Sequence, residues 1–139
     1  MPVRRRGSQA RRNPGRRASL PDAFETSVSR ALDSLPADAQ RLLETVAIVI
    51  EQEPSPRQRL EEELEPDETL YGLYEGTPIT EYGADSVPYP NKITIFRGPL
   101  EADFPDRRGL EEEIRITILH ELAHHVGFGD RTLHDFGLD

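Results

Sequence analysis

The chain has 139 residues, enough for one domain, and its 17 basic and 26 acidic residues give a formal charge of −9. It contains no cysteine, which excludes disulfides and thiolate metal ligands and is compatible with a reducing cytoplasm. No stretch approaches the roughly 18 apolar residues of a membrane span, and no apolar segment follows the first arginines as in a secretory signal. We therefore expect a cytoplasmic protein without a membrane partner.

Residues 1–20 differ in composition from the rest of the chain. They contain seven arginines and no acidic residue, so ten basic and 26 acidic residues remain outside them, a formal charge of −16. Such a block is typical of a disordered basic arm, and we assign residues 1–20 to a disordered basic N-terminal arm and residues 21–139 to the folded domain. The acidic domain argues against a nucleic-acid-binding face, which leaves nonspecific contact by the arm.

Two helices are predicted at the start of the domain. Apolar residues recur at helical spacing over residues 22–34, and Asp22 is placed as an N-cap with Glu25 three residues further on. Pro36 interrupts this helix. Residues 37–44 are typical of a second, shorter helix with two leucines facing inward.

Three strands are predicted next. Residues 45–51 are rich in β-branched side chains and favour a buried strand, although the same run could extend the preceding helix. Alternation indicates further strands over residues 70–76 and 92–96. Residues 53–69 indicate a surface loop or a short exposed helix, and residues 77–90 indicate a long loop of the kind that often carries function.

A long helix is predicted close to the end of the sequence. Residues 98–99 end the third strand, and residues 100–108 form a short acidic connection. The helix follows Gly109, carries Glu111–Glu113 in its first turn and ends at Gly127. The expected fold class is α+β, with a small mixed sheet of about three or four strands packed on helices and this helix near the C-terminus.

The last helix carries the segment HELAHHVGFGD, residues 120–130, which holds three of the four histidines. His120 and His124 are one turn apart on the same helix face, so two imidazoles can bind one metal ion. Glu121 lies about 100° further round the helix. That is too far for a good ligand but suits a base that takes a proton from metal-bound water.

A third ligand is predicted shortly after the second histidine. Gly127 allows the chain to leave the helix, and Asp130 follows at the spacing of a third ligand in the longer HExxHxxGxxD pattern. Carboxylate is an acceptable zinc ligand. His134 is an alternative third ligand if the turn is longer. His125 points away from His124 and is expected at the surface or around the ligands. The competing interpretation of the segment is an exposed polar helix end.

At these residues the sequence resembles the zincin metallopeptidases, and over residues 22–138 it is similar to the small bacterial minimal zincin family. The segments VAIVIEQEP, LYGLYEG, KITIFRGPLE and HELAHHVGFGD carry this resemblance. It implies a reduced α+β zincin core with zinc held by His120, His124 and Asp130, and with Glu121 as the general base. It further implies an edge strand, residues 92–97, that aligns an extended peptide beside the metal.

Two functions follow from this resemblance. The first is a zinc-dependent peptidase acting, as a monomer, on a peptide or protein substrate. Tyr82 and Tyr89 are candidate transition-state donors, and ordinary loop packing is favoured for both. The alternative is a metal-binding regulatory or interaction module with weak or lost peptidase activity. It is favoured by the single lobe with its basic arm. The chain also lacks the methionine-containing turn of larger metzincin-type enzymes, since Met1 is the only methionine, which argues against efficient proteolysis.

Overall fold

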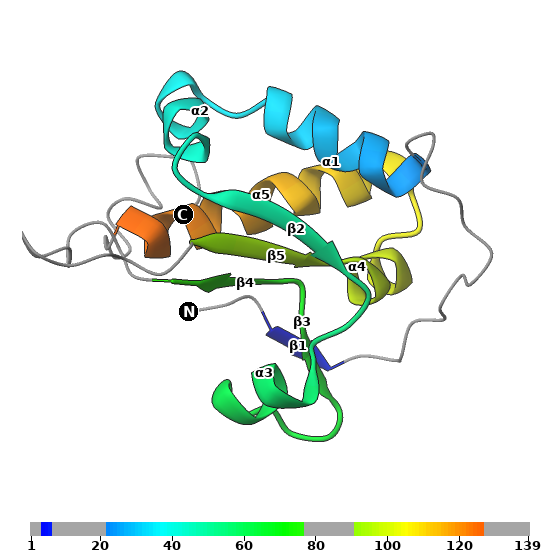
Figure 1. The fold of residues 1–139 in the computed structure, drawn as a ribbon. Coiled ribbons are helices and arrows are strands. Elements are labelled where there is room, and N and C mark those ends of the chain that lie inside the picture. The colour runs from blue at the N-terminus through cyan, green and yellow to red at the C-terminus, as the bar shows by residue number, and fades with distance from the viewer. Residues whose placement is uncertain (1–3, 7–21, 77–90, 127–139) are drawn as a thin grey trace, which may run out of the picture.

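The computed structural model describes residues 4–6, 22–76 and 91–126, and within them helices and strands follow one another as labelled in Figure 1. In chain order they are β1 (Arg4–Arg6), α1 (Ala23–Asp33), α2 (Ala37–Leu43), β2 (Ala47–Glu51), α3 (Pro56–Glu61), β3 (Glu68–Leu70), β4 (Gly72–Glu75), β5 (Lys92–Phe96), α4 (Arg97–Asp103) and α5 (Arg107–Val126). The predicted α+β class is confirmed. None of the described helices is long and apolar enough to cross a membrane.

The main sheet has three strands in the order β2-β5-β4. β5 pairs in parallel with β2 and antiparallel with β4, so that Thr94 lies opposite both Val49 and Leu73. The small mixed sheet is therefore confirmed, but the edge position implied for residues 92–97 is wrong. β5 is the central strand, and the side chains of its last four residues are all buried, as expected for a strand covered on both faces. The edges of the described sheet are β2 and β4.

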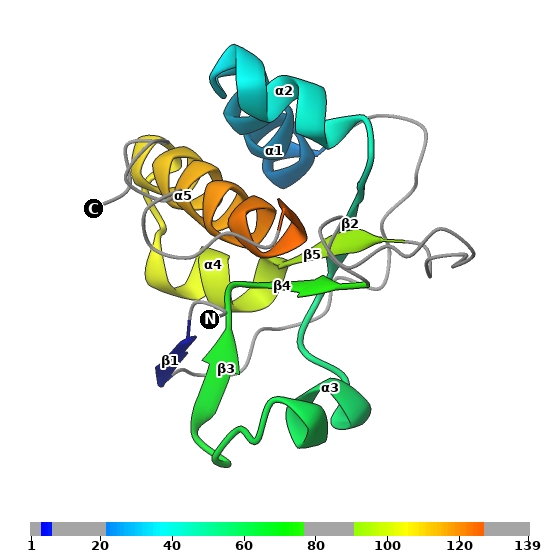
Figure 2. The ribbon, with the colours of Figure 1, turned by 90° about the vertical axis from the view of Figure 1, so that its left-hand side faces the viewer.

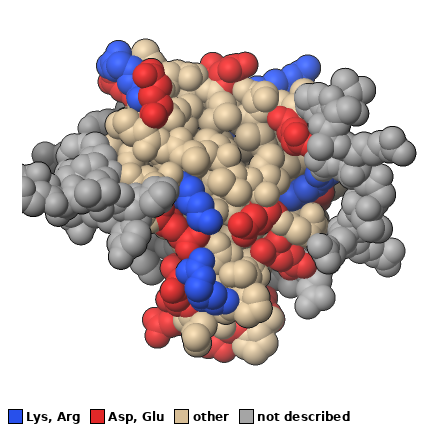
Figure 3. Space-filling model, in the orientation of Figure 1, with Lys and Arg blue, Asp and Glu red and all other residues tan. Residues whose placement is uncertain are grey.

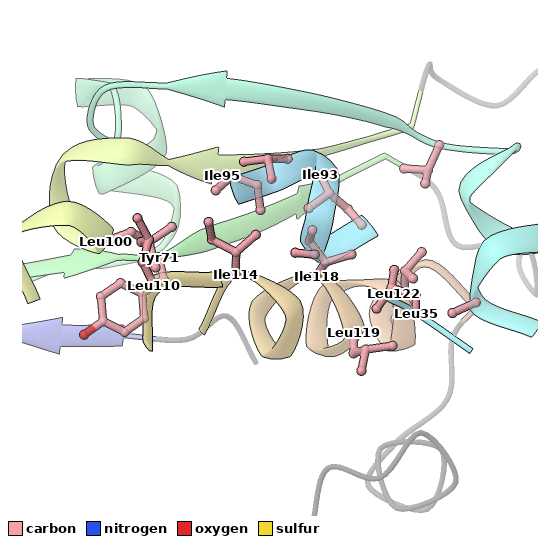
Figure 4. Packing of buried hydrophobic residues seen from close by; sticks show 14 of the residues in the cluster. Leu35, Tyr71, Ile93, Ile95, Leu100, Leu110, Ile114, Ile118, Leu119 and Leu122 are labelled. Carbon is pink, nitrogen blue, oxygen red and sulfur yellow. The ribbon is translucent and has the colours of Figure 1, made fainter. Parts of the chain in front are cut away.

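α5 packs against the sheet and α1 packs against α5, an arrangement that Figure 2 shows from the end of the molecule. In Figure 4, Ile93 and Ile95 of β5 point toward Ile114 and Ile118 of α5, and all four are fully buried. Burying a side chain of this size contributes about 1.5–3 kcal/mol. One face of α5 is thus held firmly on the sheet, which fixes where its last two turns lie.

The start of α1 is fixed by a predicted cap. The Asp22 carboxylate accepts a hydrogen bond from the Glu25 amide at 2.8 Å, which confirms Asp22 as the N-cap. The same carboxylate lies 2.5 Å from the Arg97 guanidinium, which in turn lies over the Phe24 ring at 5.4 Å. The cap therefore also joins α1 to α4.

Two predictions about the segment before α5 are wrong. Part of the expected acidic connection is helical, because α4 begins at Arg97 directly after β5. Pro99 is tolerated there since the first turn of a helix does not need its amide hydrogens. α5 then begins at Arg107, with Asp106 accepting from the Gly109 amide at 2.9 Å. Glu111–Glu113 therefore lie beyond the first turn.

The segment expected to be a loop or a short helix contains α3, with a Ser55–Gln58 capping box at its start. Buried Gln58 donates to Glu75 Oε1 at 3.0 Å, and exposed Arg57 lies 3.2 Å from the other oxygen of that carboxylate. Figure 3 shows side chains of both charges meeting around α3, below the sheet. These contacts tie α3 to the end of β4.

Part of the basic arm is paired with the domain. β1 runs antiparallel to β3, with Arg4 opposite Leu70 and Arg6 opposite Glu68. Residues 1–3 and 7–20 lie outside the described residues, so the assignment of a disordered arm stays a prediction.

Glu113 on α5 gives a pH-dependent prediction. Burial raises the pKa of its carboxyl above the ordinary value, and the charge of nearby Glu112 raises it further. A raised folded-state pKa means that the folded protein gains stability in acid and loses it as the pH rises through that pKa. Glu113→Gln should therefore raise the free energy of unfolding at pH 7, by up to about 0.5 kcal/mol for this half-buried site.

The measurement is urea denaturation of both proteins at pH 7 and at pH 4. The advantage of Glu113→Gln should shrink as the pH falls from 7 to 4, because protonation of the wild-type carboxyl removes the buried charge. An advantage of equal size at both pH values, or a loss of stability at pH 7, would refute the raised pKa of the Glu113 carboxyl in the folded protein.

Candidate metal centre

The last two turns of α5 bring the two predicted histidine ligands together. The ring centroids of His120 and His124 lie 6.0 Å apart with an angle of 41° between the planes, and both side chains are partly exposed. They occupy one helix face because they are four residues apart. The arrangement offers two imidazoles on one accessible side of the helix, as a shared metal ion requires.

Glu121 faces the sheet side of the same helix. Its side chain is almost fully buried, and its Oε1 accepts a hydrogen bond from the Tyr74 backbone amide of β4 at 2.9 Å. The carboxylate is thus held next to the histidine pair by the neighbouring edge strand.

His125 is not at the surface, so that part of its prediction is wrong. It is fully buried, its Nε2 lies 2.7 Å from Thr45 Oγ1, and its Nδ1 lies 3.1 Å from Tyr74 Oη. Burial lowers the pKa of the His125 imidazole below its ordinary value. The sequence did contain a signal for this position. His125 follows Ile118 by seven residues and Leu122 by three, which places it on the apolar face of the helix.

Tyr74 is a site residue that the sequence analysis does not single out. Its backbone amide binds Glu121, and its hydroxyl donates to Asn91 Oδ1 at 3.1 Å while it also lies against His125. The sequence places Tyr74 on a strand but gives no indication of which helix that strand contacts. The two candidate tyrosines of the sequence analysis, Tyr82 and Tyr89, lie outside the described residues.

The predicted third ligand falls beyond the end of the described helix. Gly127, Asp130 and His134 all lie outside the described residues. Within residues 22–76 and 91–126, no three histidine, aspartate or glutamate side chains come together at a metal position. Both candidate third ligands therefore stay predictions.

Gly72 explains how closely β4 approaches the motif helix. A Cβ atom at this position would lie 2.5 Å from Thr117 Cγ2 and 3.2 Å from the Thr94 carbonyl oxygen. The 2.5 Å contact is shorter than real Cβ contacts and the 3.2 Å contact is tight, so a side chain here would force Thr117 or the strand to shift. The absence of a side chain lets Tyr74, two residues later, reach Glu121 and His125.

Gly72→Ala is therefore expected to destabilise the protein by about 1–3 kcal/mol, the usual cost of overpacking a core. Gly109→Ala is a matched control, because its Cβ would meet only Asp106 Oδ2, at an ordinary 3.6 Å. The control should be neutral or stabilising by up to about 1 kcal/mol, since alanine favours a helix. Urea denaturation measures both. Equal changes in unfolding free energy for the two substitutions would contradict the close approach of β4 to α5 at Gly72.

The comparisons with known proteins bear directly on this helix. The family model of zincin-like metallopeptidases matches residues 43–138, more than half of the chain and all of HELAHHVGFGD. The chain belongs to the zincin-like metallopeptidase family. The match confirms the family expected from the motif and extends from the end of α2 to beyond α5.

A solved structure is also similar to this zincin-like protein. It is a conserved hypothetical protein from Thermo thermophilus, with 28% sequence identity and a TM-score of 0.47. The alignment covers 75% of this chain and 91% of the other. No curated protein matches the zincin-like chain.

Proposed function

We propose that this zincin-like protein is a zinc-dependent metallopeptidase that hydrolyses peptide bonds as a monomer. In this proposal His120, His124 and Asp130 hold zinc, and Glu121 is the general base. The observation that carries it is the pairing of an accessible His120–His124 face with an adjacent Glu121 held at an edge strand. Membership of the zincin-like family supports the same reaction class.

The available donors suit zinc. Imidazole nitrogen and carboxylate oxygen are its usual ligands when no thiolate is present, and the chain has no cysteine. Zinc, when bound, polarises the scissile carbonyl and makes its bound water more acidic.

In this proposal Glu121 carries out both proton transfers of the reaction. Glu121 takes a proton from the attacking water as the new C–O bond forms, and it passes a proton to the amine that leaves when the C–N bond breaks. The Tyr74 amide orients the Glu121 carboxylate through one oxygen.

β4 is the strand best suited to hold a peptide substrate. It is an edge of the described sheet and lies beside α5. The Tyr71 carbonyl accepts from the Phe96 amide, so the backbone groups of Tyr71, Leu73 and Glu75 point toward β5. Alternation then directs the Gly72 amide to the outer edge, the same edge as the Tyr74 amide that already donates to Glu121. An extended peptide can pair there by main-chain hydrogen bonds. The formal charge of −16 outside residues 1–20 favours basic or neutral peptides.

The test is digestion of a proteome-derived peptide library by zinc-loaded, tag-free protein, with Glu121→Gln as the matched control. We expect mass spectrometry to find new peptide termini with the wild type and not with the variant. Cleavage at the same positions by both proteins would rule out Glu121 as the base. No cleavage by a wild type that binds zinc would favour the second candidate.

That second candidate is a metal-binding regulatory or interaction module. The burial of Glu121 and its bond to a backbone amide favour it, since both are also typical of a structural carboxylate. In a module, Glu121→Gln would leave the cellular phenotype intact, whereas in a peptidase it would remove it.

A further inference from the structure

We propose that His125 and Tyr74 are positioning residues for the metal centre. Their contact locks the last turn of α5 onto β4 and thereby orients His124 and Glu121. The inference rests on the proposed metal site, and it gives a role to a histidine that the motif itself does not use.

Two pairs of residues lie side by side along the end of α5. His120 and His124 form one pair, and Glu121 and His125 form a second pair with the same spacing of four residues. The second pair is turned by about 100° from the first, which directs it toward β4. Tyr74 contacts both of its members, Glu121 through the backbone amide at 2.9 Å and His125 through the hydroxyl at 3.1 Å.

The His125 ring is held on both sides. Nδ1 of His125 lies 3.1 Å from the Tyr74 hydroxyl oxygen, and Nε2 lies 2.7 Å from the Thr45 hydroxyl oxygen. The two hydroxyls are themselves fixed, because Tyr74 donates to Asn91 Oδ1 and Thr45 donates to the Leu42 carbonyl. The Tyr74 and His125 rings also pack together, with centroids 5.4 Å apart. With both nitrogens engaged and the ring fully buried, His125 acts as an anchor in this arrangement and not as a ligand.

Anchoring His125 constrains its neighbour. The peptide bond between His124 and His125 is rigid, so fixing one residue in a helix fixes the direction in which the other projects. Thr45 connects the same anchor to the segment between α2 and β2, while Tyr74 connects it to the opposite edge of the sheet. Replacing a residue that holds a metal ligand in place typically lowers metal affinity or activity by about 10–100-fold.

The experiment measures Zn²⁺ affinity by competition with a chelator and the visible absorption of the Co²⁺-loaded protein. Tyr74→Phe removes the hydroxyl but keeps the backbone amide that binds Glu121. His125→Leu removes both ring contacts, and His125→Asn keeps a polar atom near the position of Nδ1. We expect about 10–100-fold weaker Zn²⁺ binding and an altered Co²⁺ spectrum in Tyr74→Phe and His125→Leu, with partial rescue in His125→Asn.

Combining Tyr74→Phe with His125→Leu should weaken binding little more than His125→Leu alone, because both remove one shared contact. Leu110→Ala controls for general loss of stability, since Leu110 is buried at the other end of α5. It should melt earlier and bind Zn²⁺ as the wild type does.

Wild-type Zn²⁺ affinity and an unchanged Co²⁺ spectrum in folded Tyr74→Phe, and in His125→Leu where it folds, would overturn the positioning role without contradicting the metal centre. A wild type that binds no Zn²⁺ would remove the metal centre itself, and the positioning role with it.

Discussion

Replacing Glu121 by glutamine is expected to lower kcat by about 10²–10⁴-fold, the usual contribution of general acid–base catalysis, while leaving zinc bound. An amide cannot take a proton from water at neutral pH, but its oxygen can still accept from the Tyr74 amide. The local fold should therefore survive. The measurement is kcat on a peptide that the wild type cleaves, together with the zinc content of the variant.

Glu111→Gln is the matched control for this variant. It makes the same change in charge on the same helix, ten residues before Glu121, and should leave kcat unchanged. If Glu121→Gln kept the wild-type kcat, the base would have to be another group, and the assignment of Glu121 would be wrong.

Ile118→Ala is expected to cost about 2–5 kcal/mol of unfolding free energy, the range for deleting most of a buried aliphatic side chain. Ile118 is fully buried and points from α5 toward the sheet in Figure 4. Since α5 carries both the core and the histidines, the loss should also lower the temperature at which the protein retains zinc. Urea denaturation gives the first quantity and zinc release on heating gives the second.

Ile116→Ala tests whether burial is the cause. Ile116 lies two residues earlier on the same helix and is only partly buried. Its replacement should cost clearly less than that of Ile118. Equal losses would mean that the contact between α5 and the sheet does not dominate the stability of this helix.

Much of the fold follows from local patterns in the sequence. The Asp22 cap and the strand at residues 92–96 are both predicted from short-range signals, and both are present in the structure. α4 is not predicted, because Gly98 and Pro99 are typical of a stop after a strand. In the structure Pro99 lies in the first turn of a helix, where its missing amide hydrogen costs little.

The order of the strands could not be predicted in the same way. The resemblance places residues 92–97 at an edge, whereas pairing on both sides makes β5 central. Only tertiary packing decides which strands flank it. Gly72 was a hint, since a glycine inside a strand often marks a close approach of another part of the chain.

The motif predicts the His120–His124 pair and the neighbouring Glu121, because helical spacing alone sets their relation. It could not predict that Tyr74 holds Glu121, since the two residues are 47 positions apart and their contact depends on how β4 lies on α5. For the same reason the motif shows a second histidine beside His124 without showing that His125 is buried against β4.

The most direct test of the central claim is the zinc content of tag-free protein by elemental mass spectrometry, with wild type, His124→Ala and Asp130→Ala measured side by side. The metal centre proposed for His120, His124 and Asp130 predicts about one zinc per wild-type chain and clearly less in both variants. A wild type without zinc after incubation with zinc at neutral pH, or variants that bind as much as the wild type, would contradict it.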